Sequence, residues 1–348
     1  MSGTWTFSGD TTLKKGRPAI ALDVMGGDRA PLATLEGAVR WHQSSGLYAT
    51  LVGDVALMKR GLLKAGANPD DWTLIDAPDV ISMADHPVQT IRSEPRASIR
   101  RCAELIKSGE AQALVSMGNT GAALAAGVLI VGRADGVERP GLAAMIPTHK
   151  EPALVIDVGA NAEARPEHLR DFALMGTLYK QHQLGQSEPR VAVLSIGEES
   201  SKGSPLTLAA AKLLTATPLN FVGNIEPGGI FSGDADVIVC DGFTGNLFLK
   251  SIEATAEFAF SSLRSAVKQR PFTIPGLALM YPALRAVRSR TAYDQYGGVP
   301  LLGVNGIVII GHGRSNALAV SNALAAAADA VGHDLVKKIT EDMGNIAK

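Results

Sequence analysis

Short apolar runs alternate with longer amphipathic stretches along most of the chain. The runs are rich in β-branched or small residues and are bounded by Gly, Asp or Pro, which is the pattern of buried strands. We expect strands at 19–24, 49–53, 113–117, 153–158, 191–196, 237–240 and 307–310. The stretches 31–44, 98–108, 166–181, 205–214 and 315–330 have the spacing typical of helices.

This alternation predicts βαβ units, and therefore a three-layer α/β/α fold around a mostly parallel sheet. We expect one α/β/α domain over residues 17–343, after a flexible tail at residues 1–16. In such sheets ligands bind beyond the carboxyl ends of the strands. The residues that follow each predicted strand are therefore the candidates for chemistry.

The segment 247–292 departs from the alternation. A long helical run leads to an apolar tip punctuated by prolines, and a second helical stretch returns to about residue 290, so we expect a protruding helical hairpin. The apolar tip residues are Phe272, Ile274, Leu277, Leu279 and Met280. Lysine and arginine flank the tip, which would suit either pairing with a second subunit or peripheral contact with an anionic membrane surface.

The composition is that of a folded protein with a large core. The chain has 348 residues, of which 46% are hydrophobic and 19% charged, and its net charge is -1. This balance lacks the global basic field that attracts nucleic acid, so we expect no nucleic-acid partner. Two cysteines without metal-ligand spacing suit a reducing compartment. With a polar N-terminus and no run near the roughly 20 apolar residues that span a bilayer, we expect a cytoplasmic protein.

Glycine, asparagine, threonine and aspartate concentrate after the predicted strands. Glycine lets backbone N–H groups converge on an anion, and a following helix N-terminus adds partial positive charge. Turn geometry and helix capping explain any one such segment, and none matches the P-loop or the dinucleotide fingerprint. Six of them at one edge of a parallel sheet would form a shared anion-binding crevice. The candidate binding residues are Gly26, Gly27, Asp28, Gly118, Asn119, Thr120, Gly121, Asp157, Asn161, Gly203, Ser204, Thr244 and Gly245.

These motifs, in this order, resemble the bacterial phosphate acyltransferases of phospholipid synthesis. The matching segments are DVMGGDRAP at 23–31, SMGNTGA at 116–122, DVGAN at 157–161, RPEHL at 165–169, IGEE at 196–199, CDGFTGN at 240–246 and YGGVPLLG at 296–303. The resemblance implies an enzyme that reversibly forms acyl phosphate from acylated acyl carrier protein and inorganic phosphate. It also implies a fold similar to the phosphotransacetylase and isocitrate dehydrogenase superfamily, and a homodimer built through the hairpin. A membrane acyltransferase that acylates glycerol 3-phosphate would consume the product.

The implied reaction requires phosphate to be aimed at a thioester carbonyl while the oxyanion is stabilised. Phosphate is a competent nucleophile and a thiolate is a good leaving group, so we expect no covalent intermediate, no metal and no cofactor. The segment 201–204 resembles the Lys-Gly-Ser segment of phosphotransacetylases, and its lysine could grip phosphate or be a solvated loop residue. The candidate catalytic residues are Lys202, His312, Asp241 and Asn246.

Three side chains that could take part in chemistry have structural alternatives of equal or greater weight. The histidine at 312 could transfer protons near neutral pH or could be a structural hydrogen-bonding group. Cys102 and Cys240 lie in a predicted helix and a predicted strand, where cysteine is usually a small hydrophobic residue rather than a nucleophile.

Acyl carrier protein is acidic, so its docking surface is expected to be basic. Arg92, Arg96 and Arg100 recur four residues apart, and Arg101 adjoins them. Helical spacing would align these arginines on one face as a docking surface for the carrier. A solvated helix face is the alternative.

Two other functions stay open at this point. A phosphotransacetylase-like enzyme would use acyl-CoA in place of the carrier protein, and a non-catalytic scaffold would recruit phospholipid enzymes to the membrane. The Gly-, Asn- and Thr-rich segments argue against the scaffold. A dehydrogenase would share the fold, but the chain has no nicotinamide fingerprint.

Overall fold

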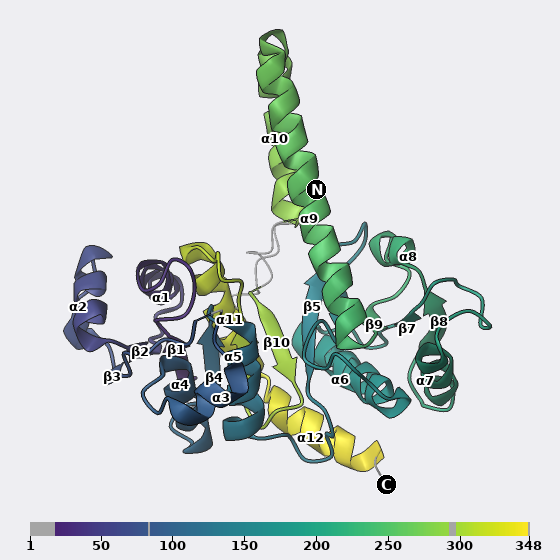
Figure 1. Ribbon diagram of the computed structural model, residues 1–348, viewed down its shortest axis with the longest axis horizontal. Helices are drawn as coiled ribbons and strands as arrows, with labels where there is room; N and C mark the ends of the chain where they lie inside the picture. Colours follow the sequence, from purple (N-terminus) through teal and green to yellow (C-terminus); the bar gives the residue numbers. More distant parts are fainter. Residues whose placement is uncertain (1–17, 83, 292–296, 347–348) are drawn as a thin grey trace.

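The computed structural model describes residues 18–82, 84–291 and 297–346 (Figure 1). Within them, eleven strands form one sheet in the order β3-β2-β1-β4-β11-β10-β5-β6-β9-β7-β8. The first parallel block contains β1 (Ile20–Asp23), β2 (Thr50–Gly53), β3 (Leu74–Asp76), β4 (Ala113–Ser116) and β11 (Ile307–Ile310). The second contains β6 (Ala153–Ile156), β7 (Val191–Leu194), β8 (Phe221–Ile225) and β9 (Val237–Val239).

Two strands join the blocks: β5 (Gly141–Ile146) and β10 (Val299–Leu302). β10 pairs antiparallel with both β11 and β5, and β5 pairs antiparallel with β6. The sheet is therefore mostly parallel, as predicted, but its two parallel blocks are not continuous. The expectation that six strand ends share a single edge is wrong, because these antiparallel pairings divide the loops into two groups.

Helices cover both faces of the sheet, which confirms the three-layer α/β/α fold. The side chains of successive strand residues lie on opposite faces of the sheet: Ile20 and Leu22 belong to one apolar cluster, whereas Ala21 belongs to the other. The first cluster is covered by α1 (Leu32–Ser45), α2 (Val55–Lys64), α6 (Pro166–Leu184), α7 (Pro205–Thr215), α11 (Ala317–Gly332) and α12 (Leu335–Ile346). The second is covered by α3 (Pro87–Ser93), α4 (Ser98–Lys107), α5 (Thr120–Ala126) with its π-helical continuation η2 (Gly127–Val131), and α8 (Pro227–Ser232).

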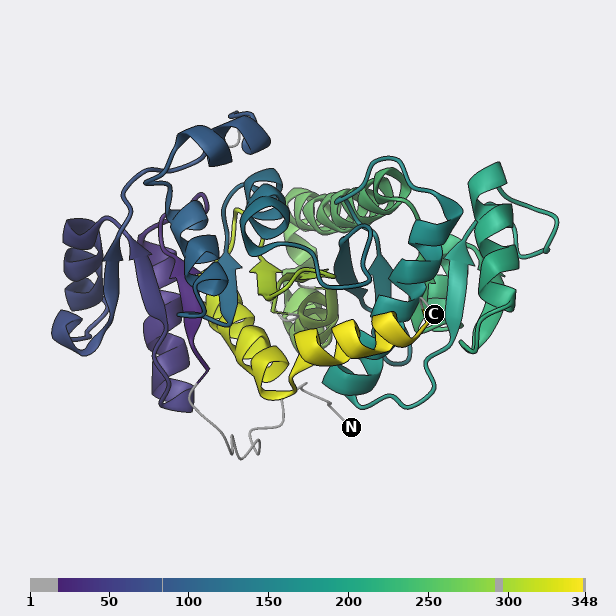
Figure 2. The same cartoon turned by 90° about the horizontal axis from the view of Figure 1, so that it is seen from below.

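The C-terminal helices connect the two halves of the body. α11 packs against α1 in the first half, and α12 packs against α6 in the second. Figure 2 shows these two helices, in yellow, lying across the centre of the molecule. All the predicted strands and helices are present, with ends within a few residues of the prediction, whereas β3, β5, β8 and β10 were not predicted.

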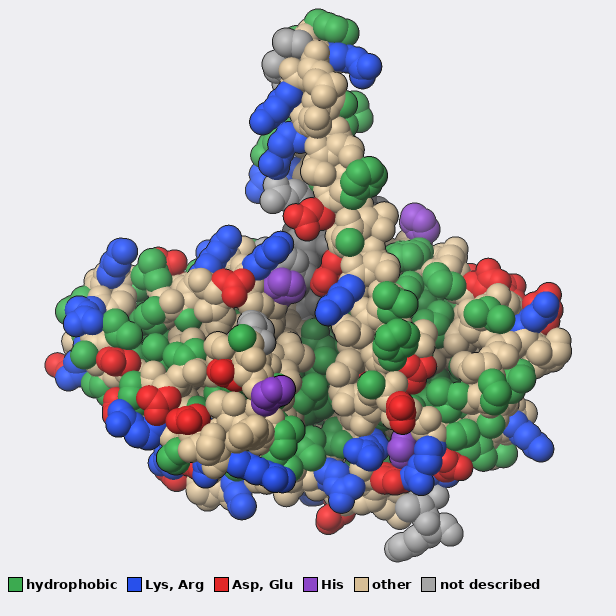
Figure 3. Space-filling model, viewed as in Figure 1, with side chains coloured by type: hydrophobic (Ala, Val, Ile, Leu, Met, Phe, Trp, Pro, Cys, Tyr) green, Lys and Arg blue, Asp and Glu red, His purple; other side chains and the backbone are tan. Residues whose placement is uncertain are grey.

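A helical pair projects from the body, as Figures 1 and 3 show. It is formed by α9 (Gly242–Gln269), a short helix η3 (Pro271–Thr273) and α10 (Ile274–Thr291). At its tip Phe272 is 80% exposed and Leu279 is 85% exposed, and Met280 is exposed as well. The side chains of Ile274 and Leu277 lie outside the described part of the structure, as does residue 292 at the predicted end of the hairpin. No described helix combines the length and the apolar character needed to cross a membrane.

Candidate active site

The loops that follow β1, β4 and β11 lie against one another in the first half. The N–H of Asp28 donates to the carbonyl oxygen of Gly313 at 2.8 Å. A methyl group added at Gly26 would lie 2.8 Å from the backbone nitrogen of Gly118, so only glycine fits there. These contacts bring together the predicted binding residues of three loops that are far apart in the sequence.

A buried carboxylate anchors this first group of loops. Asp23 accepts hydrogen bonds of 2.6 Å from the hydroxyls of Ser98 and Ser116. The Ser116 hydroxyl in turn accepts from the N–H of Gly118 at 3.1 Å. Burial raises the pKa of Asp23, and the two hydroxyls offset part of that rise. Asp23 thus joins β1, α4 and the loop after β4.

Asn119 uses its side chain to hold the loop after β4 in place. Its Oδ1 accepts from the N–H of Ala122 at 3.1 Å and caps α5, while its Nδ2 donates to the carbonyl oxygen of Ser82 at 2.8 Å. The Asn119 side chain therefore holds the loop, which can offer an anion its backbone N–H groups and the hydroxyl of Thr120. Thr120 is exposed and Gly121 is half-buried at this position.

In the second half, Asp157 organises the loop after β6. Its carboxylate accepts from the N–H groups of Leu142, Gly159, Ala160 and Asn161 and from the Asn161 side chain, at 2.7 to 3.1 Å. Burial raises the pKa of Asp157, and these donors offset part of the rise. Because the loop's N–H groups point at their own carboxylate, Asp157 and Asn161 build the site and leave anion binding to other loops.

The loop after β9 leads directly into α9. Asp241 caps this helix by accepting from the N–H of Thr244 at 2.9 Å and from its hydroxyl at 2.7 Å. The N–H of Gly242 donates to the carbonyl oxygen of Asn161 at 2.8 Å, which ties the loop after β6 to the start of α9. Asn246 lies beside Gly159, because a methyl group at Gly159 would be 3.7 Å from its Cγ. Four predicted residues of the second half are thus in one place.

Lys202 lies on the loop between β7 and α7 with its side chain exposed. Its carbonyl oxygen accepts from the Asn224 side chain at 3.0 Å and from the Ser195 hydroxyl at 3.4 Å, so the backbone is fixed. Gly203 follows with φ +128°, a conformation that favours glycine, and Ser204 caps α7. The ammonium group is therefore carried on a defined loop and can reach an anion near the N-terminus of α7.

His312 is exposed on the loop after β11. Its Nδ1 accepts from the N–H of Arg314 at 3.1 Å, so a neutral imidazole carries its proton on Nε2. Arg314 also pairs with Glu257 of α9 at 4.0 Å, and this contact joins the first group of loops to the helix that starts from the second. Figure 3 shows the surface hollowed between the two halves, beside the base of the hairpin.

The predicted arginine surface is not one helical face. α3 ends at Ser93 and α4 begins at Ser98, so the arginines lie on two helices and the turn between them. Arg100 donates to the carbonyl oxygens of Ile91 and Arg92 and pairs with Glu104 at 2.9 Å. Arg101 also pairs with Glu104, at 3.3 Å. Arg92 and Arg96 remain exposed, although Arg96 lies 4.0 Å from Asp76.

Neither cysteine has the environment of a nucleophile. Both are buried, and burial raises the pKa of each thiol well above its usual range, which disfavours the reactive thiolate. The thiol of Cys240 lies 3.4 Å from the carbonyl oxygen of Asp157. Among the described residues, no group of three His, Cys, Asp or Glu side chains is placed to hold a metal ion.

The sequence pattern does not predict the residues that contact these loops from distant positions in the chain. Ser98 was seen only as the start of a helix, and Pro140, whose carbonyl oxygen accepts from the Asn161 side chain at 2.7 Å, was not considered. Ser116 lay inside a recognised motif but had no assigned role. No local signal marks such residues, because their partners lie tens of residues away in the chain.

The chain is similar to known proteins over most of its length. A family model described as "Fatty acid synthesis protein" matches residues 19–338. A phosphate acyltransferase of Desulforudis audaxviator is 43% identical over 332 residues, which cover 94% of this chain and 96% of the relative. One from Moorella thermoacetica is 45% identical over 318 residues, or 91% and 93% of the two chains.

Solved structures with the same fold are far more distant in sequence. A phosphotransacetylase from Streptococcus pyogenes superposes with a TM-score of 0.62 at 16% identity, covering 91% of this chain and 94% of the other. A branched-chain phosphotransacylase from Enterococcus faecalis gives a TM-score of 0.54 at 15% identity, covering 90% and 99%. At this identity the likeness extends to the fold, including the mostly parallel sheet with helices on both faces.

Proposed function

The chain belongs to the phosphate acyltransferase family, and we propose that it transfers the acyl group of acylated acyl carrier protein to inorganic phosphate. A phosphate oxygen attacks the thioester carbonyl carbon, the carbon–sulfur bond breaks, and the proton of hydrogen phosphate passes to the departing thiolate. The products are acyl phosphate and the free carrier thiol. A membrane acyltransferase that acylates glycerol 3-phosphate would consume the acyl phosphate.

This proposal is supported by two groups of glycine-bearing loops, of which the first is linked to α9 by the ion pair between Arg314 and Glu257. Helix N-termini, glycine-bearing loops and one exposed lysine supply N–H groups and positive charge, which are the requirements for holding phosphate and a tetrahedral oxyanion. We assign phosphate or oxyanion contacts to the backbone of 119–121 and 244–246 and to Lys202. Asp157, Asn161 and Asp241 hold these loops in position. The Gly26–Asp28 loop completes the first group.

His312 is our candidate for a hydrogen-bond donor to the phosphate or the oxyanion, while the proton passes from hydrogen phosphate to the thiolate. Its ring is exposed at the rim of the first loop group, and the hydrogen bond from the N–H of Arg314 fixes the neutral tautomer with Nε2 as donor. Because phosphate is itself the nucleophile, the buried thiols of Cys102 and Cys240 need take no part.

The direct test is phosphate-dependent release of free carrier from acylated acyl carrier protein. Wild type should release the thiol and form acyl phosphate, and Lys202→Ala should lower kcat/KM for phosphate at least about tenfold through loss of a charged contact. Lys212→Ala, which removes an exposed lysine of α7, is the matched control. Turnover of acyl-CoA at an equal rate would favour a phosphotransacetylase-like activity, and absence of acyl phosphate with either donor would reject the proposal.

For the carrier protein we propose docking on Arg92 and Arg96, which stay exposed while Arg100 and Arg101 are engaged with Glu104. Charge reversal by Arg92→Glu or Arg96→Glu should raise the apparent KM for the carrier severalfold at low salt, and the effect should shrink as salt screens the charges. The KM for phosphate should not change. A KM for the carrier that equals the wild-type value would contradict this docking surface.

We further propose that the protein is cytoplasmic and forms a homodimer through the hairpin. We also propose that the tip of the hairpin makes peripheral contact with the inner face of the cell membrane. Exposed Phe272, Leu279 and Met280 at the end of a projecting pair support this, since such side chains gain free energy by leaving water. Leu279→Glu should reduce co-sedimentation with anionic liposomes, with Leu63→Glu, an exposed leucine of the body, as control. Equal binding by both variants and wild type would count against the tip. The molar mass in solution, measured by light scattering, tests the homodimer: the mass of a single chain would contradict it.

A further inference from the structure

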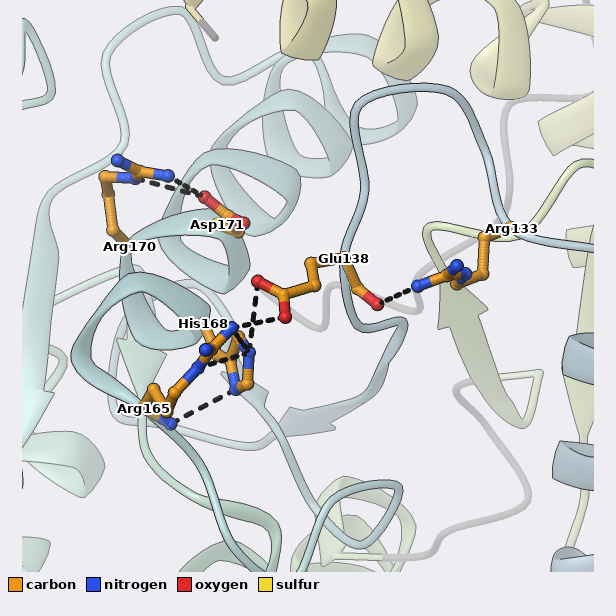
Figure 4. Close-up of polar contacts among 6 residues, drawn as sticks. All are labelled: Arg133, Glu138, Arg165, His168, Arg170 and Asp171. Atoms are coloured by element: carbon orange, nitrogen blue, oxygen red, sulfur yellow. Dashed lines mark hydrogen bonds and ion pairs between the residues drawn. The ribbon is translucent and has the colours of Figure 1, made fainter.

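Glu138 links the connection between η2 and β5 to the N-terminus of α6. It lies in the connection between η2 and β5, and its carboxylate pairs with Arg165 and lies 3.5 Å from Nε2 of His168 (Figure 4). Arg133 donates to its carbonyl oxygen at 2.7 Å. Arg165 and His168 stand at the N-terminus of α6, immediately after the loop that Asp157 organises. We call Glu138, Arg165 and His168 the Glu138 clamp.

Both ring nitrogens of His168 are engaged in the clamp. Nδ1 of this buried ring accepts from the backbone N–H of Arg165 at 3.1 Å, and Nε2 lies 3.2 Å from Nη2 of Arg165 and 3.5 Å from the Glu138 carboxylate. Partial desolvation raises the pKa of the Glu138 carboxyl, but the charge of Arg165 and the contact with His168 outweigh it, and the pKa lies below its usual range. Glu138 is therefore a carboxylate at neutral pH.

The same connection also holds the middle of the loop 157–165. Two residues after Glu138, the carbonyl oxygen of Pro140 accepts from the side chain of Asn161 at 2.7 Å. Asn161 donates to Asp157 from its backbone and side chain, and its carbonyl oxygen accepts from the N–H of Gly242, the first residue of α9. The segment 138–140 thus holds the loop 157–165 at its middle and at its C-terminal end, and that loop contacts the start of α9.

We propose that Glu138 is a positioning residue for acyl transfer: through its clamp on Arg165 and His168 it fixes the loop 157–165, and through that loop the Thr244–Asn246 segment that faces the substrates. Glu138 touches neither loop group's substrate-facing N–H groups, so its effect is indirect. The proposal rests on the proposed function for its kinetic consequence, whereas the loop-fixing step stands on the contacts alone.

The clamp should contribute more to geometry than to stability. The side chains of Glu138 and Arg165 are 51% and 59% exposed, and exposed ion pairs contribute little free energy to folding. Positioning, by contrast, is sensitive to small displacements, because misplacing a contact by about 1 Å can cost up to about 100-fold in rate. A variant that removes the clamp is therefore expected to lose turnover while remaining folded.

The test compares Glu138→Ala and Glu138→Gln with Glu341→Ala. Glu341 pairs with Lys337 at 3.8 Å on α12, and both side chains are more than half exposed, so this variant controls for loss of an exposed ion pair. We expect Glu138→Ala to lower kcat about tenfold with an unchanged KM for the carrier, Glu138→Gln to be intermediate, and Glu341→Ala to match wild type. Thermal midpoints of all three should agree within a few degrees.

Amide hydrogen exchange supplies a readout that does not depend on activity. In Glu138→Ala, segment 157–165 should exchange faster while the strands β6 and β9 keep their protection. If wild type forms no acyl phosphate, the proposed function fails but the exchange result still decides the clamp. Unchanged protection of 157–165, or kinetics equal to those of Glu341→Ala, would overturn the proposal. Should Glu138→Ala fail to fold, Glu138→Gln carries the same comparison.

Discussion

A buried aspartate stands at the end of a strand in each parallel block, and the two carboxylates organise their surroundings differently. Asp157 accepts from four backbone N–H groups, three of them in the turn that immediately follows it. Asp23 accepts from the hydroxyls of Ser98 and Ser116, which belong to α4 and β4. One carboxylate folds its own loop, whereas the other joins separate elements.

The difference has a chemical consequence. Hydroxyl groups can rotate toward other acceptors when a carboxylate is removed, but backbone N–H groups in a fixed turn cannot. The second half of the site should therefore tolerate change less well than the first. In the loop after β6, three N–H groups donate to the carboxylate of Asp157. In the loop after β4, the side chain of Asn119 instead caps α5.

The largest expected effect is that of Asp157→Ala. Each buried N–H left without an acceptor costs about 1–3 kcal/mol, so we expect the free energy of unfolding to fall by at least about 3 kcal/mol and acyl transfer to be lost. Asp23→Ala, the matched variant of the first half, should cost roughly half as much. Urea unfolding followed by circular dichroism measures both free energies of unfolding. Equal decreases for the two variants would contradict the proposed difference between the two carboxylates.

The next largest effect on stability is expected at the glycines that pack near the two aspartates, Gly245 near Asp157 and Gly118 near Asp23. A methyl group at Gly245 would lie 2.0 Å from the carbonyl oxygen of Asp157, whereas at Gly118 the nearest atoms are 3.2 Å away. Overpacking costs about 1–3 kcal/mol, so Gly245→Ala should be destabilising by that amount although alanine favours helices, and Gly118→Ala by less than about 1 kcal/mol. Thermal unfolding of the pair decides it: a stable Gly245→Ala protein would mean that the start of α9 can shift.

Much of the fold was predictable because its strands are locally distinctive. β1 and β11 consist almost entirely of apolar residues, and the helix that follows β11 begins after Asn316, which caps it. β8 and β10 escaped prediction because they contain residues typical of turns: Gly223, with φ +105°, in one and Pro300 in the other. Their strand character comes from pairing with neighbours, which the local pattern does not encode.

The site was predictable only in part, for a related reason. Motifs named the loops, but strand order decided which loops meet, and the antiparallel pairings of β5 and β10 were invisible in the pattern. The arginine spacing was misleading because the chain turns between Ser93 and Ser98, where Pro95 disfavours a continuous helix. Contacts such as that between Asp23 and Ser98 arise from packing across 75 positions of the sequence.

The smallest effect is the pH dependence of Asp23→Asn. Asparagine keeps one acceptor oxygen, and its amide group can donate to a serine hydroxyl, so the loss at neutral pH should be about 1 kcal/mol. Because burial raises the pKa of Asp23, the folded state binds this proton more tightly than the unfolded chain. The aspartate's contribution to stability should therefore fall as the pH rises from about 3.8 toward the raised pKa, and then stay constant.

Asp236 provides a control of opposite sign for this measurement. Burial raises its pKa, but hydrogen bonds from Arg190, one of them 2.9 Å long, outweigh burial and the net pKa is lowered. Its contribution should therefore be present above the unfolded value of about 3.8 and be lost as the pH falls through the folded pKa. Unfolding free energies of wild type, Asp23→Asn and Asp236→Asn between pH 3 and 7 should give difference curves of opposite slope. Parallel slopes would mean that the carboxylate of Asp23 is better solvated than its contacts with Ser98 and Ser116 indicate.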